Sequence, residues 1–214
     1  MRKEAKELQH KLASFGIKLK KKELKKLERY IDLLKEWNKL ISLISKNEIR
    51  RVWGYHVFDS LVVSKYIGKK SSIADWGSGA GFPGIPVAII REDAEVHLME
   101  SKKKKAAFLL RIVEELGLSN AKVWANRAEE IEKRFDVITL RQVGKMRKVL
   151  PMVIEKLKEK GKVIFFKGEN YEKEIKEASK IIEKYRLEYN TKIFYLPGGI
   201  KRVFVFFKRR NDCS

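Results

Sequence analysis

Four glycines in one short loop are the residues best placed to hold a ligand. The loop follows the apolar run Ser72–Trp76, and its glycines are Gly77, Gly79, Gly81 and Gly84. Glycine has no side chain to keep a ligand away, so the backbone amides of such a loop can approach it closely. In a parallel α/β sheet, a loop of this kind binds nucleotide-like cofactors where the first strand ends. The sequence therefore predicts a cofactor site here.

Two cofactors compete for this loop. From Gly79 to Gly84 it matches the GxGxxG pattern of dinucleotide-binding proteins, so an NAD enzyme stays an alternative. However, Asp75 stands two residues before the first glycine, and the chain ends in a predicted antiparallel hairpin instead of a second βαβαβ half. Both features are typical of Rossmann-like methyltransferases. The sequence therefore favours S-adenosylmethionine.

Side chains after the next two strands extend the predicted cofactor site. Glu100 ends the second strand, where a carboxylate can accept hydrogen bonds from both hydroxyls of a cofactor ribose. Ala128 and Glu129 follow the third strand, where the adenine would lie, and Phe82 in the loop is placed to stack on a base. The alternatives are a solvated strand-end acid at Glu100 and a helix-opening acid at Glu129.

From Ser71 onward, strand-like runs alternate with helical patterns. The predicted strands are Ser72–Trp76, Glu95–Glu100, Lys122–Asn126, Phe135–Leu140, Lys162–Lys167, Lys192–Leu196 and Arg202–Lys208. The predicted helices are Pro86–Arg91, Lys102–Leu116, Met146–Lys160 and Tyr171–Tyr185. This rhythm predicts an α/β fold with a parallel sheet. The short turn Pro197–Gly199 makes the last two strands antiparallel.

The first 70 residues are predicted to be helical and basic. Apolar residues recur there every three or four positions, with lysines and acids between them. The chain has a formal net charge of +21, and about half of the excess lies in residues 1–70. Such a balance favours a polyanionic partner, nucleic acid first; the alternative is the Lys- and Glu-rich surface of a thermophilic protein. We expect a helical cap over 1–70 and a sheet domain over 71–214.

Several classes of protein are excluded. The single cysteine, Cys213, cannot form a disulfide within the chain, which is consistent with a reducing cytoplasm. A cysteine-built zinc site is excluded as well, and no metal site is expected. No apolar run is long enough to span a membrane, and the charged N-terminal residues lack the apolar segment of a signal peptide. We therefore expect a cytoplasmic protein with no membrane partner.

Six segments, spread over most of the chain, carry a resemblance to one family. They are Leu33–Lys39, which ends in W-N-K; His56–Leu61, with H-x-x-D-S; Asp75–Pro86, with D-x-G-S-G-x-G-x-P-G-I-P; Arg127–Glu130; Ile138–Arg141; and Phe166–Gly168. On these segments the sequence resembles the RsmG family, also called glucose-inhibited division protein B. The loop motif is the most specific of the six, because it goes beyond the glycines that methyltransferases share.

The resemblance implies a fold, an activity and a set of contacts. The fold is that of class I S-adenosylmethionine-dependent methyltransferases, a mostly parallel seven-stranded sheet with a C-terminal antiparallel hairpin, plus an N-terminal helical extension. The activity is methylation of guanine N7 in 16S rRNA, free or in the small ribosomal subunit, and we expect a monomer. Implied cofactor contacts are Gly77, Phe82, Ala128, Glu129 and Arg141. The chain departs from the family pattern at Tyr55, Leu140 and Gln142.

The residues after the fourth strand agree with methylation at guanine N7. They lack the Asp/Asn-Pro-Pro-aromatic motif of exocyclic amine methylation and the Asp of ribose methylation, and Cys213 lies in the tail, away from any ring-activating role. Guanine N7 has a free lone pair, so the transfer needs alignment but no general base. We expect Arg141 as a positioning residue at the rim between cofactor and RNA. The alternative is a surface arginine paired with an acid.

Other interpretations stay open at this point. His56 and Asp59 are either functional or a packed structural pair. The protein itself is either this enzyme, a methyltransferase with another RNA acceptor, or an RNA-binding ribosome assembly factor that holds the cofactor without turnover.

Overall fold

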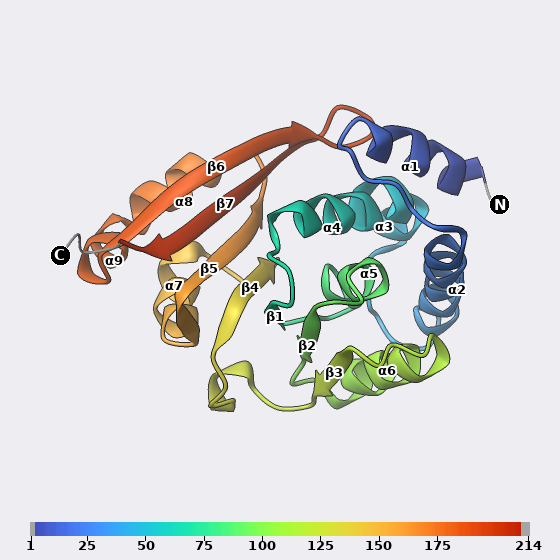
Figure 1. Ribbon diagram of the computed structural model, residues 1–214, viewed down its shortest axis with the longest axis horizontal. Helices are drawn as coiled ribbons and strands as arrows, with labels where there is room; N and C mark the ends of the chain where they lie inside the picture. The colour runs from blue at the N-terminus through green and yellow to red at the C-terminus, as the bar shows by residue number, and fades with distance from the viewer. Residues whose placement is uncertain (1–2, 211–214) are drawn as a thin grey trace.

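A seven-stranded sheet is the centre of the computed structural model, which describes residues 3–210 (Figure 1). The strands are β1 (Ser72–Trp76), β2 (Glu95–Met99), β3 (Ala121–Trp124), β4 (Phe135–Arg141), β5 (Leu157–Lys167), β6 (Leu187–Tyr195) and β7 (Lys201–Arg209). They lie in the order β3-β2-β1-β4-β5-β7-β6, parallel except that β7 runs antiparallel to both its neighbours. The predicted α/β fold with a terminal hairpin is confirmed.

One face of the sheet packs against the N-terminal helices and the helices that follow β1 and β2. These helices are α1 (Lys3–Ala13), α2 (Lys21–Trp37), α3 (Lys46–Arg50), α4 (Phe58–Val63), α5 (Gly84–Ile90) and α6 (Lys103–Glu115). Buried side chains of α2 and α4, such as Leu27 and Leu61, belong to the same apolar cluster as Val96 and Leu98 of β2. The first 70 residues therefore share a continuous core with the sheet.

The opposite face carries α7 (Met146–Ile154), α8 (Tyr171–Glu177) and α9 (Ser179–Lys184), as Figure 1 shows. Its apolar cluster includes Ile138, Phe165 and Phe207, whose sequence neighbours Val137, Phe166 and Phe206 belong to the other cluster. Alternate residues of a strand point to opposite faces. Burial on both sides explains why these strands are nearly continuous apolar runs.

Two predicted helices in the second half of the chain are shorter than expected. The helix from Met146 ends at Ile154, because Leu157 pairs with Phe135 and begins β5. The three residues that follow Leu157 are exposed lysine and glutamate, which are common in helices and rare in strands. Only the pairing of Leu157 with Phe135 shows that this segment is a strand. The predicted helix Tyr171–Tyr185 is divided at Ala178 into α8 and α9.

The segment before β1 is more broken than its apolar period predicts. The short helix α3 has Ser45 as its N-cap. The hydroxyl of Ser45 accepts from the amide of Glu48, and the Glu48 carboxylate accepts from the amide of Ser45. A π-helical turn, Trp53–Val57, then precedes α4, and a 3-10 turn, Ser64–Tyr66, follows it. π-Turns within helices are frequent at functional sites, and this one contains His56. Cys213 lies outside the described residues.

Candidate active site

The glycine loop folds into a tight turn at the carboxyl end of β1. Gly77, Gly79 and Gly81 have φ angles of +74°, +56° and +95°, a region that glycine adopts without steric cost. The amide of Gly79 donates to Glu100 Oε2 at 3.0 Å, which joins the loop to the end of β2. A Cβ at Gly81 would meet the hydroxyl of Tyr30 at 3.0 Å. Gly81 thus permits packing beneath the loop, whereas Gly77 and Gly79 line the pocket above it.

Asp75 holds the loop from below. Its Oδ2 accepts from the amide of Gly84 at 3.0 Å, and its Oδ1 lies 3.3 Å from Thr139 Oγ1 on β4. The side chain is buried, which raises the pKa of Asp75 to about 6 in spite of these hydrogen bonds. Asp75 does not line the pocket. The structure therefore places this predicted site residue under the loop, where it shapes the backbone.

A pocket of about 140 Å³ opens beside the loop. Its lining comes from the glycine loop, the carboxyl end of β4, the N-terminal segment and the first turn of α6. The residues are Leu43, Ile44, His56, Gly77, Ser78, Gly79, Ala80, Phe82, Lys105, Arg141 and Gln142. Parallel sheets bind ligands in such a place, outside the carboxyl ends of their strands. Four predicted site residues, Gly77, Gly79, Phe82 and Arg141, meet in this pocket.

The remaining predicted cofactor residues follow β2 and β3, and Glu100 is joined to the pocket through the amide of Gly79. Glu100 accepts from the amides of Gly79 at 3.0 Å and Lys102 at 2.8 Å, one on each carboxylate oxygen. Each oxygen keeps a further lone pair, so both can also accept from ribose hydroxyls. Ala128 is buried and Glu129 is exposed on the short turn after β3. This arrangement fits a nucleoside laid across the strand ends.

Arg141 differs from its predicted position at an open rim. Its side chain is 5% exposed, and Nη1 donates to Asp59 Oδ1 at 2.9 Å. Nη2 donates to the carbonyl of Tyr55 at 3.3 Å. Arg202 of β7 reaches the same carboxylate, with Nε 3.0 Å from Oδ2. Arg141 therefore forms part of the pocket floor, and a buried acid holds its guanidinium.

The aromatic ring of Tyr55 lies among three arginines. The guanidinium carbons of Arg51, Arg141 and Arg202 are 5.3, 5.7 and 5.0 Å from its centroid. The negative face of an aromatic ring attracts cations at such distances. Burial lowers the pKa of Arg141 and raises that of Asp59, because it disfavours the charged form of each group. The charges of the cluster therefore depend on their contacts with one another and with the Tyr55 ring. Sequence patterns do not identify Arg202 as a member of this cluster.

His56 is a neutral wall of the pocket. Its ring stacks on Phe82, with centroids 4.8 Å apart and an interplanar angle of 27°. Burial, together with the charges of Arg141, Arg202 and Arg51, lowers the pKa of His56 to about 2. Neither ring nitrogen makes a well-formed hydrogen bond among the described residues, although Nε2 lies 3.5 Å from Oε1 of Glu48.

The sequence of the chain identifies its family. Residues 23–195 match the family described as rRNA small subunit methyltransferase G, GidB. The chain belongs to this family. Among its relatives is the ribosomal RNA small subunit methyltransferase G of Sorangium cellulosum, 36% identical over 88% of this chain and 82% of the relative. The protein of that name from Lactococcus lactis subsp. cremoris is 33% identical over 94% of this chain and 89% of the relative.

Solved structures share the fold of this GidB chain. M. jannaschii TYW2 in complex with AdoMet superposes with a TM-score of 0.60 over 80% of each chain, at 18% identity. The B. subtilis tRNA methyltransferase TrmK gives 0.59 over 74% of this chain and 67% of its own, at 20% identity. At these identities the likeness concerns the fold alone. Together with family membership it confirms a small-subunit rRNA methyltransferase whose cofactor is S-adenosylmethionine, and NAD is no longer an alternative.

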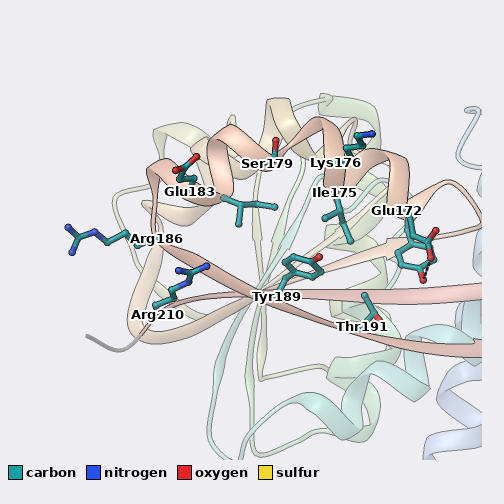
Figure 2. A pocket seen from close by; sticks show the side chains of 11 residues that line it. Glu172, Ile175, Lys176, Ser179, Glu183, Arg186, Tyr189, Thr191 and Arg210 are labelled. Atoms are coloured by element: carbon teal, nitrogen blue, oxygen red, sulfur yellow. Dashed lines mark hydrogen bonds between the residues drawn. The ribbon is translucent and has the colours of Figure 1, made fainter. Parts of the chain in front are cut away.

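Two findings complete the description of the GidB chain. Among residues 3–210, no helix is long and apolar enough to cross a membrane. A larger hollow, about 1070 Å³, lies away from the glycine loop, between α8–α9 and β6 (Figure 2). Tyr189 and Thr191 form its floor and Arg186 and Arg210 its open end. It contains none of the predicted site residues, so we place the chemistry at the smaller pocket.

Proposed function

We propose that this protein methylates N7 of a guanine in 16S rRNA. The bound cofactor supplies the chemistry, an electrophilic methyl group on a positively charged sulfur. Membership of the GidB family supports small-subunit rRNA as the acceptor. The choice of N7 rests on the pocket, whose side chains suit an acceptor atom that already has a free lone pair.

The protonation state of His56 carries this proposal. Among the described residues that line the pocket there is no thiol, and the carboxylate at its edge, Glu48 beside Gln142, has a lowered pKa and is therefore a weak base. The two cations, Lys105 and Arg141, do not accept a proton, and His56 with a pKa near 2 is too weak a base at neutral pH. Guanine N7 bears no proton, so its methylation needs none of these groups as a base. Alignment of the two reactants then provides most of the catalysis.

Each predicted cofactor residue has a distinct task in this proposal. The backbone of Gly77 and Gly79 approaches the cofactor, and the Glu100 carboxylate accepts from its ribose hydroxyls. Phe82, stacked on His56, forms an apolar wall. Ala128 and Glu129 flank the adenine, as the residues after the third strand do in the predicted site. Arg141 is a positioning residue, fixed by Asp59, that keeps a positive charge at the pocket floor.

The charge of the whole chain supports an RNA partner. A net charge of +21 attracts phosphate backbones and speeds encounter with them. Such a substrate is found in the cytoplasm, where we propose that the protein acts as a monomer. Sedimentation of the free protein tests the last point.

Labelled-methyl transfer tests the function. Small subunits, their naked rRNA and an unrelated RNA are incubated with the protein and tritiated S-adenosylmethionine, and the modified base is then mapped. We expect label at one guanine of the small-subunit rRNA, with strand scission after reduction and aniline treatment, as N7-methylguanosine gives. Label on another base or on the unrelated RNA would overturn the proposed acceptor. Cofactor binding without any transfer would favour an assembly factor.

A further inference from the structure

A hydrogen-bond donor and an acceptor lie side by side where β4 ends. Gln142, which follows Arg141 directly and lines the pocket, has its Nε2 3.5 Å from Oε1 of Glu48 on α3. The same Oε1 is 3.5 Å from Nε2 of His56. Both contacts are at the outer limit of a hydrogen bond. Glu48 Oε1 therefore has free capacity, and Oε2, which accepts from the amide of Ser45 at 3.0 Å, keeps a further lone pair.

The backbone at Gln142 is unusual for its residue type. Its φ of +57° lies in the left-handed region, which residues with a side chain rarely adopt. Such conformations concentrate at functional sites, where the surrounding structure enforces them. Here the turn brings the exposed Gln142 amide to the pocket and opposite the partly exposed carboxylate of Glu48.

Hydrogen bonds and charge keep Glu48 ionised. Burial opposes ionisation, but the hydrogen bonds from Ser45 and Gln142 and the charge of Arg141 outweigh it, so the pKa of Glu48 is lowered. An ionised carboxylate only accepts hydrogen bonds, whereas the Gln142 amide group can donate. The pair thus offers two acceptor atoms beside one donor.

This pattern complements one face of guanine. The Watson–Crick edge of guanine has a carbonyl acceptor, O6, next to two donors, N1–H and the N2 amino group. We propose that Glu48 and Gln142 select the target base: Glu48 accepts from N1–H and the N2 amino group, and Gln142 donates to O6. Adenine would turn the lone pair of its N1 toward the carboxylate, which disfavours it. The inference rests on the proposed function, because it presumes a guanine acceptor.

Inosine provides the test, since it differs from guanosine only by lacking the N2 amino group. Small-subunit rRNA is prepared with guanosine or inosine at the mapped position, and the two RNAs compete for methylation in one reaction. The wild type is expected to prefer guanosine by about tenfold or more, the effect of one hydrogen bond to a charged group. In Glu48→Gln this preference should fall to about twofold or less.

The choice of Glu48→Gln separates base selection from structure. Glutamine also forms a capping box, so α3 and its contact with Ser45 are retained. A purely structural role would slow both RNAs by the same factor and leave the preference unchanged, which would overturn the proposal. Because the preference is a ratio within one reaction, partly inactive protein does not alter it.

Two further variants complete the design. Glu23→Gln is the matched control, because Glu23 caps α2 in the same way, accepting from the amide of Lys20 at 2.6 Å; it should keep the full preference. Gln142→Ala should slow both RNAs equally, since guanosine and inosine share O6, and a changed preference there would refute its assignment. If the wild type modifies no guanine at all, the proposed function fails. If it does so without any preference over inosine, only the base-selection proposal fails.

Discussion

Removal of the Asp59 charge is the most informative perturbation of this fold. Asp59 is fully buried, and its two oxygens lie 2.9 Å from Arg141 Nη1 and 3.0 Å from Arg202 Nε. Both arginine side chains are less than 10% exposed, so neither can turn to water when the carboxylate is lost. Asp59→Asn preserves the shape and leaves two buried cations without their shared counter-ion.

The expected loss follows from this burial. Breaking a buried ion pair by removing one partner costs about 3–5 kcal/mol, because the other charge stays desolvated. For a protein of this size, that loss corresponds to a fall in Tm of about 6–20 °C. The arginine contacts with the Tyr55 ring remain and offset a part of it, so we expect about 3 kcal/mol, toward the lower limit.

Urea unfolding followed by tryptophan fluorescence measures this loss, with Glu188→Gln as the control. Glu188 pairs with Lys208 across β6 and β7 at 2.8 Å, but both side chains are about half exposed. The same carboxylate-to-amide change should cost about 1 kcal/mol or less there. If Asp59→Asn is no more destabilising than this control, the arginines do not depend on Asp59 and the description of the cluster is wrong.

Four further variants test the glycine loop and the residues that hold it. Tyr30→Phe removes a buried hydrogen bond of 2.6 Å to the carbonyl of Ala80 and should cost about 1–2 kcal/mol in urea unfolding. Gly84→Ala places a Cβ 2.7 Å from Asp75 Oδ2 and should cost about 1–3 kcal/mol by overpacking. At Gly79 a Cβ meets no atom closer than 3.8 Å, so Gly79→Ala should cost only about 1–2 kcal/mol, through its φ of +56°, and should in addition weaken cofactor binding in calorimetry. Folding raises the pKa of Asp75 from 3.8 to about 6, so its contribution to stability is present at low pH and is lost as the pH rises through 6. Asp75→Asn should therefore gain up to about 3 kcal/mol relative to the wild type between pH 4 and pH 7, in unfolding curves at each pH.

The parallel strands were predictable because strands buried on both faces consist of nearly continuous apolar residues, which are visible in the sequence. β1 and the start of β4 lie where those runs predict them. The errors fall where partners far along the chain decide the structure. Residues 158–160 are polar and would suit a helix, yet β5 extends through them because Leu157 pairs with Phe135.

The candidate site divides in the same way. Gly77, Gly79 and Arg141 carry local motifs, and the structure brings these three residues to one pocket. Arg202 comes directly before the apolar run Val203–Phe207 and is buried with it, so its charge needs a buried partner. Ser45 and Glu48 form a capping-box pattern that marks the start of a helix. Neither signal tells which distant residues it will meet, since that depends on how the N-terminal segment packs on the sheet.

The buried charges at this junction explain why that packing has one orientation. Apolar side chains of the N-terminal segment and the sheet could interdigitate in several ways at similar energy. Asp59 of α4 has both of its counter-ions only where Arg141 of β4 and Arg202 of β7 reach it. Any other arrangement would leave a desolvated carboxylate beside two desolvated guanidiniums, which is far more costly than an imperfect apolar contact. The same register brings Glu48 and His56 to the end of β4, so the ion cluster that orients the helices also positions these two side chains beside Gln142.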